Sequence, residues 1–129
     1  MKLRLLIFCW VTVSSLLFMA PPPWEWGDWA QPLMYTYVEN QHAIQTAAHI
    51  VLMGGCAFLL QLLFRRYGSG RAFMLALILT MLFAAGMEIV QGFLPRRFHR
   101  ESDLMDLWPG LIGALVGCAI GWALTRRKA

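Results

Sequence analysis

The chain has 129 residues, of which 59% are hydrophobic and only 14% charged, with a mean hydropathy of +0.57 and a formal net charge of +4. Soluble domains are typically about half apolar and a quarter charged. A soluble domain of this length has too little interior to hide such an apolar excess, so the composition predicts one membrane-embedded domain covering residues 1–129. The basic residues do not interleave with aromatic ones on a common face, which excludes a nucleic-acid surface.

Four apolar runs, at residues 3–20, 43–64, 72–94 and 108–124, are each close to the ~20 residues that a ~30 Å hydrocarbon core requires. Inside lipid such runs satisfy their backbone groups as helices. We therefore predict an all-α integral membrane fold, a four-helix transmembrane bundle. The first run also fits a secretory signal peptide, whose cleavage would leave three spans. A retained span is favoured because residues 18 and 20 do not form the small-residue pair of a cleavage site.

The basic residues predict the orientation of the chain. With four spans, the basic residues near the N-terminus, in the 65–71 loop and at the C-terminus all fall on one side of the membrane. The positive-inside bias makes that side the cytoplasm, so both termini are expected to be cytoplasmic. Arg96, Arg97 and Arg100 lie on the outer side, together with the acidic residues other than Glu88. The net positive charge then serves to anchor the chain to anionic membrane lipids.

Glu88 lies inside the third apolar run, seven residues before Pro95 at its outer boundary, which places it ~10 Å below the surface. Gln91 shares its helix face. The second span runs the other way, so His49 reaches a similar depth, with Gln45 one turn before it. An unpaired carboxylate here would cost about 2 kcal/mol or more, which indicates a functional site. Gln45 and Gln91 are equally well explained as helix-packing hydrogen bonds.

The segment between the third and fourth spans adds charged residues to this region. The planar guanidinium groups of Arg96 and Arg97 suit binding of a carboxylate or phosphate, although arginines of an ordinary solvated loop would also lie there. Either Asp103 or Asp106 can cap the N-terminus of the last helix. Glu88 and His49 are the candidate general acid and base. The candidate ligand-binding residues are Glu88, Gln91, Arg96, Arg97, Asp103, Asp106 and His49. A cation held by His99 with the two aspartates is an alternative, but we expect no metal and no cofactor.

Small residues repeat along the last apolar run. Gly113, Gly117 and Gly121 form a stripe that allows close backbone contact with another helix. We expect this stripe to pack within the bundle, and a homo- or hetero-oligomer through the same face is the alternative. Cys9 and the other cysteines are isolated in separate runs, so neither a zinc site nor a disulfide is indicated.

Together these motifs resemble the VanZ-like family of small bacterial membrane proteins. The residues that carry the resemblance, which covers about residues 40–121, are His49, Glu88 with Gln91 as E-x-x-Q, Arg97, Asp106, and Gly113 with Gly117 as G-x-x-x-G. Gln45 and Thr46 replace an Asp-Lys pair common in the family, which removes one cation from the outer site. The resemblance implies a bacterial inner-membrane protein with a cell-envelope role, connected with antibiotic resistance through lowered susceptibility to teicoplanin.

Three functions fit these patterns. The first is an outward-facing polar pocket that binds or modifies an anionic lipid-linked envelope precursor. The second is a structural or assembly subunit of a membrane complex. The third is a proton-coupled transporter in which Glu88 and His49 relay protons, but the inner halves of the second and third spans offer only Gln61 and Thr80 as strongly polar groups, which is sparse for a continuous path.

Overall fold

The structure is a computed structural model that describes residues 2–19, 31–93, 105 and 107–126, without the side chains of 18–19 and 31–39. Within these ranges the chain is helical and has no strand. The elements are α1 (Lys2–Met19), α2 (Gln31–Phe64), the short 3-10 helix η3 (Arg65–Tyr67), α3 (Ser69–Phe93) and α4 (Leu107–Arg126). Three described segments are long and apolar enough to cross a membrane, namely Asn40–Tyr67, Ser69–Phe93 and Leu107–Arg126. The all-α prediction is confirmed, whereas a fourth span at α1 stays a prediction.

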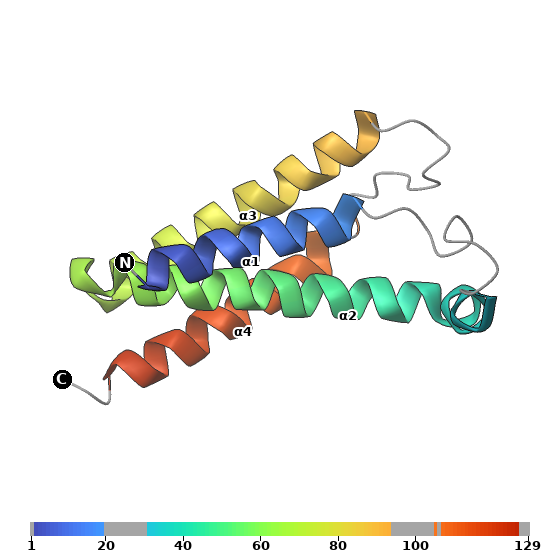
Figure 1. Cartoon of the computed structure of the whole chain (residues 1–129). Helices are drawn as coiled ribbons and strands as arrows, with labels where there is room; N and C mark the ends of the chain where they lie inside the picture. Colours follow the sequence, from blue (N-terminus) through green and yellow to red (C-terminus); the bar gives the residue numbers. More distant parts are fainter. Residues whose placement is uncertain (1, 20–30, 94–104, 106, 127–129) are drawn as a thin grey trace.

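The helices run alternately up and down (Figure 1). The start of α1 and the end of α4 lie at the same end of the molecule, beside the turn between α2 and α3. The described basic residues gather at this end, because they lie at the start of α1, around the turn and at the end of α4. This arrangement fits two termini on one side, and the identity of that side as the cytoplasm stays a prediction.

Helix α2 begins twelve residues before the expected start of the second span. The sequence predicts a second apolar span from residue 43, but the helix that contains it begins at Gln31 and continues to Phe64. Pro32 does not prevent it, because proline is tolerated in the first turn. The backbone leaves helical geometry at Asn40 (φ −118°, ψ 17°), a residue type whose side chain competes for backbone hydrogen bonds. Among the residues whose side chains are described, the membrane-capable segment runs from Asn40 to Tyr67.

A tight turn joins α2 to α3, as the sequence predicted. Gly68 has φ +90°, a left-handed conformation that residues with a Cβ rarely adopt. Its amide donates a hydrogen bond to the carbonyl of Arg65 (3.2 Å), and its own carbonyl accepts one from the amide of Ala72 (2.9 Å). The first bond closes η3 at its C-terminal end, and the second begins α3.

Helix α4 packs closely on α2 through the glycine stripe. A Cβ atom added to Gly113 would collide with the carbonyl oxygen of Ile50, and one added to Gly117 would collide with that of Gly54. Gly121 lies against a side chain further along α2, and the three glycines are buried. The expected packing within the chain is therefore confirmed, while an oligomer through this stripe stays a prediction and would have to displace α2.

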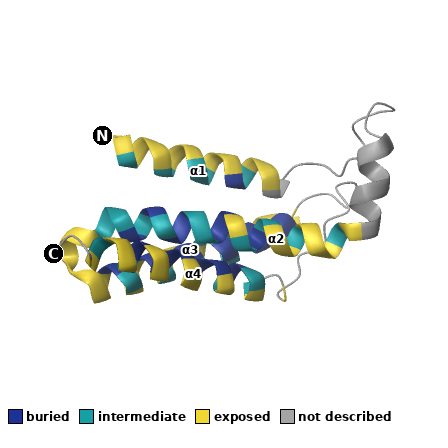
Figure 2. Cartoon of the chain, turned by 90° about the horizontal axis from the view of Figure 1, so that it is seen from below, coloured by how far each residue is buried: buried dark blue, intermediate teal, exposed yellow. Residues whose placement is uncertain are grey.

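Buried residues lie where α2, α3 and α4 face one another, and exposed residues lie on the outside of the bundle (Figure 2). The cluster shared by α2, α3 and α4 consists of Ala57, Ala76, Ala114 and Cys118. The exposed large apolar side chains include Ile78, Leu82, Ile89, Val116 and Ile120. This distribution is opposite to that of a water-soluble bundle and is typical of helices that pack inside lipid.

Candidate functional site

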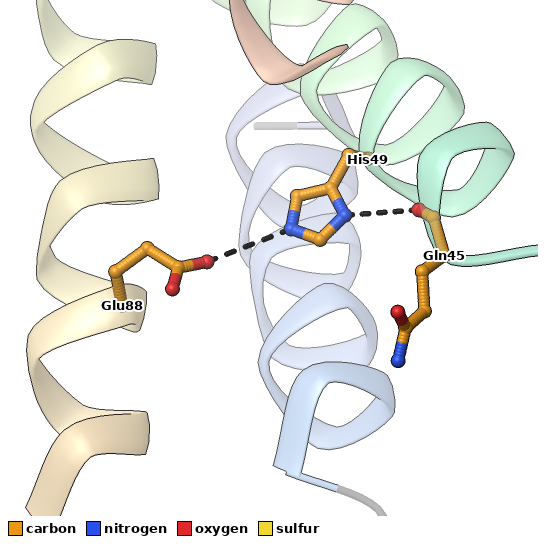
Figure 3. A network of polar contacts seen from close by, with 3 residues as sticks. All are labelled: Gln45, His49 and Glu88. Atoms are coloured by element: carbon orange, nitrogen blue, oxygen red, sulfur yellow. Dashed lines mark hydrogen bonds and ion pairs between the residues drawn. The ribbon is translucent and has the colours of Figure 1, made fainter. Parts of the chain in front are cut away.

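An acid lies beside an imidazole in the half of the bundle away from the α2–α3 turn, here called the outer half (Figure 3). Glu88 of α3 is 5% exposed and His49 of α2 is 7% exposed. The Nε2 atom of His49 lies 3.6 Å from the Oε1 atom of Glu88. The sequence placed these two residues at matching depth on antiparallel helices, and the structure brings them together.

The other ring nitrogen of His49 fixes which tautomer it adopts. Its Nδ1 atom lies 2.9 Å from the backbone carbonyl oxygen of Gln45. A carbonyl oxygen can only accept, so Nδ1 carries a hydrogen and donates it. The Nε2 atom is the ring nitrogen that faces the carboxylate oxygen of Glu88. One proton shared between Nε2 and Oε1 would leave the pair without net charge, which would lower the cost of burying it.

Apolar residues support the pair on its inner side. Leu52, Met53, Ala84 and Met87 form a buried cluster, here called the Met53 cluster. These residues come from α2 and α3, immediately inward of His49 and Glu88 along each helix. Gln91, one turn beyond Glu88 on the same face of α3, is 5% exposed. The carboxamide of Gln91 therefore extends the buried polar face toward the outer end of α3.

Helix α1 closes this region from a third side, which sequence reasoning did not foresee. Its contacts are chiefly with α2. The indole Nε1 of Trp10 donates a hydrogen bond to the carbonyl oxygen of Leu52 (2.9 Å), and the ring packs on the Met53 cluster. The ring lies over Gly55, where a Cβ atom would collide with it. Ser14, one turn further along α1, is fully buried. A polar residue four positions after a tryptophan, inside an apolar run, is the signal that could have found this face.

Several predicted site residues fall outside the described part of the chain. These are Arg96, Arg97, Asp103 and Asp106, together with His99 of the alternative cation site. Among the described residues no group of three or more His, Cys, Asp or Glu side chains is placed to hold a metal ion. Of the predicted set, the structure therefore brings together His49 and Glu88 and places Gln91 beside them.

An apolar outer surface, three helices able to cross a bilayer and a buried acid–imidazole pair define a helical membrane protein with a polar centre. The family model for VanZ/LLP1 matches residues 5–125, and the chain therefore belongs to the VanZ/LLP1 family. The match confirms the resemblance and extends it from residues 40–121 to include α1. No curated protein and no solved structure matches the chain.

Proposed function

We propose that this protein binds an anionic, lipid-linked component of the bacterial cell envelope at an outward-facing polar pocket. The observation that carries the proposal is the His49–Glu88 pair, buried between α2 and α3. Ionisable residues inside a membrane are costly and are functional by default. In this proposal Arg96 and Arg97 receive the anionic group, and Asp103 and Asp106 complete the rim.

The pair gives the pocket a way to exchange a proton with its ligand. Because Nδ1 of His49 is held by the Gln45 carbonyl, only Nε2 is available toward Glu88. A ligand group arriving between Nε2 and Oε1 meets one donor and one acceptor, whichever atom carries the proton. If the ligand is modified, the pair can accept a proton from an attacking group and return it to a leaving group. Binding alone needs only the two hydrogen bonds.

The test is susceptibility to teicoplanin and related envelope antibiotics. Cells would express the wild type, Glu88→Gln or Arg97→Ala at matched membrane levels, with His42→Ala as a control on an exposed residue of α2. We expect the wild type to lower susceptibility, both site variants to erase the effect, and the control to keep it. The glutamine keeps the size of Glu88 but cannot ionise or share the proton with Nε2.

An unchanged susceptibility across all strains would overturn the envelope proposal. The assembly-subunit function would then be the next to test, by asking whether the protein co-purifies with a membrane complex in a way that Glu88→Gln leaves intact.

A further inference from the structure

One serine hydroxyl of α1 is buried without a hydrogen bond in the described part of the chain. Ser14 is 0% exposed, and its Oγ atom has no hydrogen-bond partner there. The adjacent Ser15 behaves differently, because its Oγ donates to the carbonyl of Val11 at 2.9 Å. Buried hydroxyls in native proteins nearly always have a partner. A fully buried hydroxyl that does not use its own helix carbonyl is therefore available for a ligand.

The packing of α1 places this hydroxyl at the depth of the His49–Glu88 pair. Trp10 packs on the Met53 cluster, whose residues come from α2 and α3, and Ser14 lies four residues further along the same face of α1. Four residues span about 6 Å along the helix axis. Leu52 of α2 and Ala84 of α3 belong to the same cluster. Moving the same distance from Leu52 toward the outer half reaches residues 48–49, and moving it from Ala84 reaches Glu88, so Ser14 lies at the level of the pair. Figure 3 shows α1 passing behind the pair.

The described cations are absent from this depth. The Lys and Arg residues in the described ranges lie at the ends of the helices on the side of the α2–α3 turn. With one proton shared between His49 and Glu88 the pair carries no net charge, and the Gln91 carboxamide and Ser14 hydroxyl are neutral. Such a set of neutral groups selects its ligand by hydrogen bonding, because a polar site built to bind a hydroxyl group rejects an analogue that lacks the hydroxyl.

We propose that Ser14 completes the site with His49 and Glu88, and that this buried part binds a hydroxyl group on the headgroup of an anionic lipid. The inference rests on the proposed function, since the anionic group is assigned to the outer arginines. It adds that the headgroup carries a hydroxyl beyond its phosphate, and that α1 supplies a binding residue. A lipid is the source because the exposed faces of the helices around the site are apolar.

The test compares lipids that differ in one feature. Phosphatidylglycerol and phosphatidylethanol carry the same phosphodiester charge, but only the first has hydroxyls on its headgroup, and phosphatidylcholine is the zwitterionic control. The thermal unfolding midpoint of the full chain in detergent would be measured with each lipid for the wild type, Ser14→Ala and Ser15→Ala. We expect phosphatidylglycerol to raise the wild-type Tm by about 4 °C or more above phosphatidylethanol at saturation. Ser14→Ala should lose this difference and Ser15→Ala should keep it.

Each other outcome has a separate meaning. Equal stabilisation by the two anionic lipids, above phosphatidylcholine, overturns the hydroxyl-binding inference and leaves the proposed function standing. No preference for either anionic lipid counts against the anionic ligand of the proposed function itself. A phosphatidylglycerol preference that persists in Ser14→Ala removes Ser14 from the site. The lipid-free Tm of Ser14→Ala should equal or exceed that of the wild type, and a large decrease would show that Ser14 is structural instead.

Discussion

The Nε2 atom of His49 lies 3.6 Å from Oε1 of Glu88, while Nδ1 of the same ring is bound to the carbonyl of Gln45 in its own helix. The ring is thus oriented by α2 and aimed at α3. Because neither residue is appreciably exposed, this contact forms where water is scarce. The pair is a link between the two helices as well as a candidate site.

This link predicts that the stability losses from removing His49 and from removing Glu88 are not additive. His49→Leu removes the imidazole that faces the buried acid, and Glu88→Leu removes the carboxylate that faces the ring. We expect each single variant to lose about 1–3 kcal/mol of unfolding free energy, and the double variant to lose less than the sum of the two. A double-mutant cycle by unfolding in mild detergent measures the coupling. His42→Leu serves as the control on an exposed histidine, and additive losses would show that the pair contributes no link.

The glycine stripe makes a second prediction. In Gly117→Ala the new Cβ would collide with the carbonyl oxygen of Gly54, which is backbone and cannot move independently. We expect α4 to separate from α2 and the unfolding free energy to fall by about 2 kcal/mol or more. The matched control is Gly86→Ala in α3, where a Cβ would have nothing within 4 Å. This control should be neutral or stabilised by up to ~1 kcal/mol, because alanine favours the helix. Equal effects of the two variants would contradict the close α2–α4 contact.

The meeting of His49 and Glu88 could be predicted from the sequence, because helix rise and the ends of the apolar runs set the level of each residue along its helix. That reasoning placed Glu88 and His49 opposite each other, and the structure agrees. The glycine stripe was also predicted to face a neighbouring helix, because small residues at a spacing of four mark a single face. Both predictions depend only on the geometry of a single helix, which the spacing of residues in the sequence determines.

Relations between helices could not be predicted in the same way. The register of α1 on α2 depends on where the Trp10 ring fits over Gly55, a shape match that no periodicity in either helix encodes. Ser14 was missed for the same reason, since its burial follows from that register. The helix start at Gln31 was missed because the prolines and aromatic residues before residue 43 are typical of an interfacial loop.

A third prediction concerns Gln61 in the inner half of α2. Its side chain is fully buried, and neither Nε2 nor Oε1 has a hydrogen-bond partner in the described part of the chain. Gln61→Met keeps the length of the side chain and removes both polar atoms, so we expect a gain of about 1–3 kcal/mol in unfolding free energy. Denaturant unfolding in detergent would measure it. A loss of stability would instead show that the amide is bound by water or another group, and would revive the proton-path alternative.

The last prediction tests the orientation of the chain. Single cysteines would be introduced at Ser102, in the segment between α3 and α4, and at Gly70, in the exposed turn that begins α3. The native Cys9, Cys56 and Cys118 would be replaced first. With both termini cytoplasmic, a membrane-impermeant maleimide added to intact cells should label the variant at 102 and not the one at 70, and both should label after the membrane is opened. The basic residues beside the turn underlie this expectation, because positive loops are retained in the cytoplasm. Labelling at 70 alone in intact cells would invert the topology and place the His49–Glu88 pair nearer the cytoplasmic face, where an envelope precursor on the outer leaflet could not reach it.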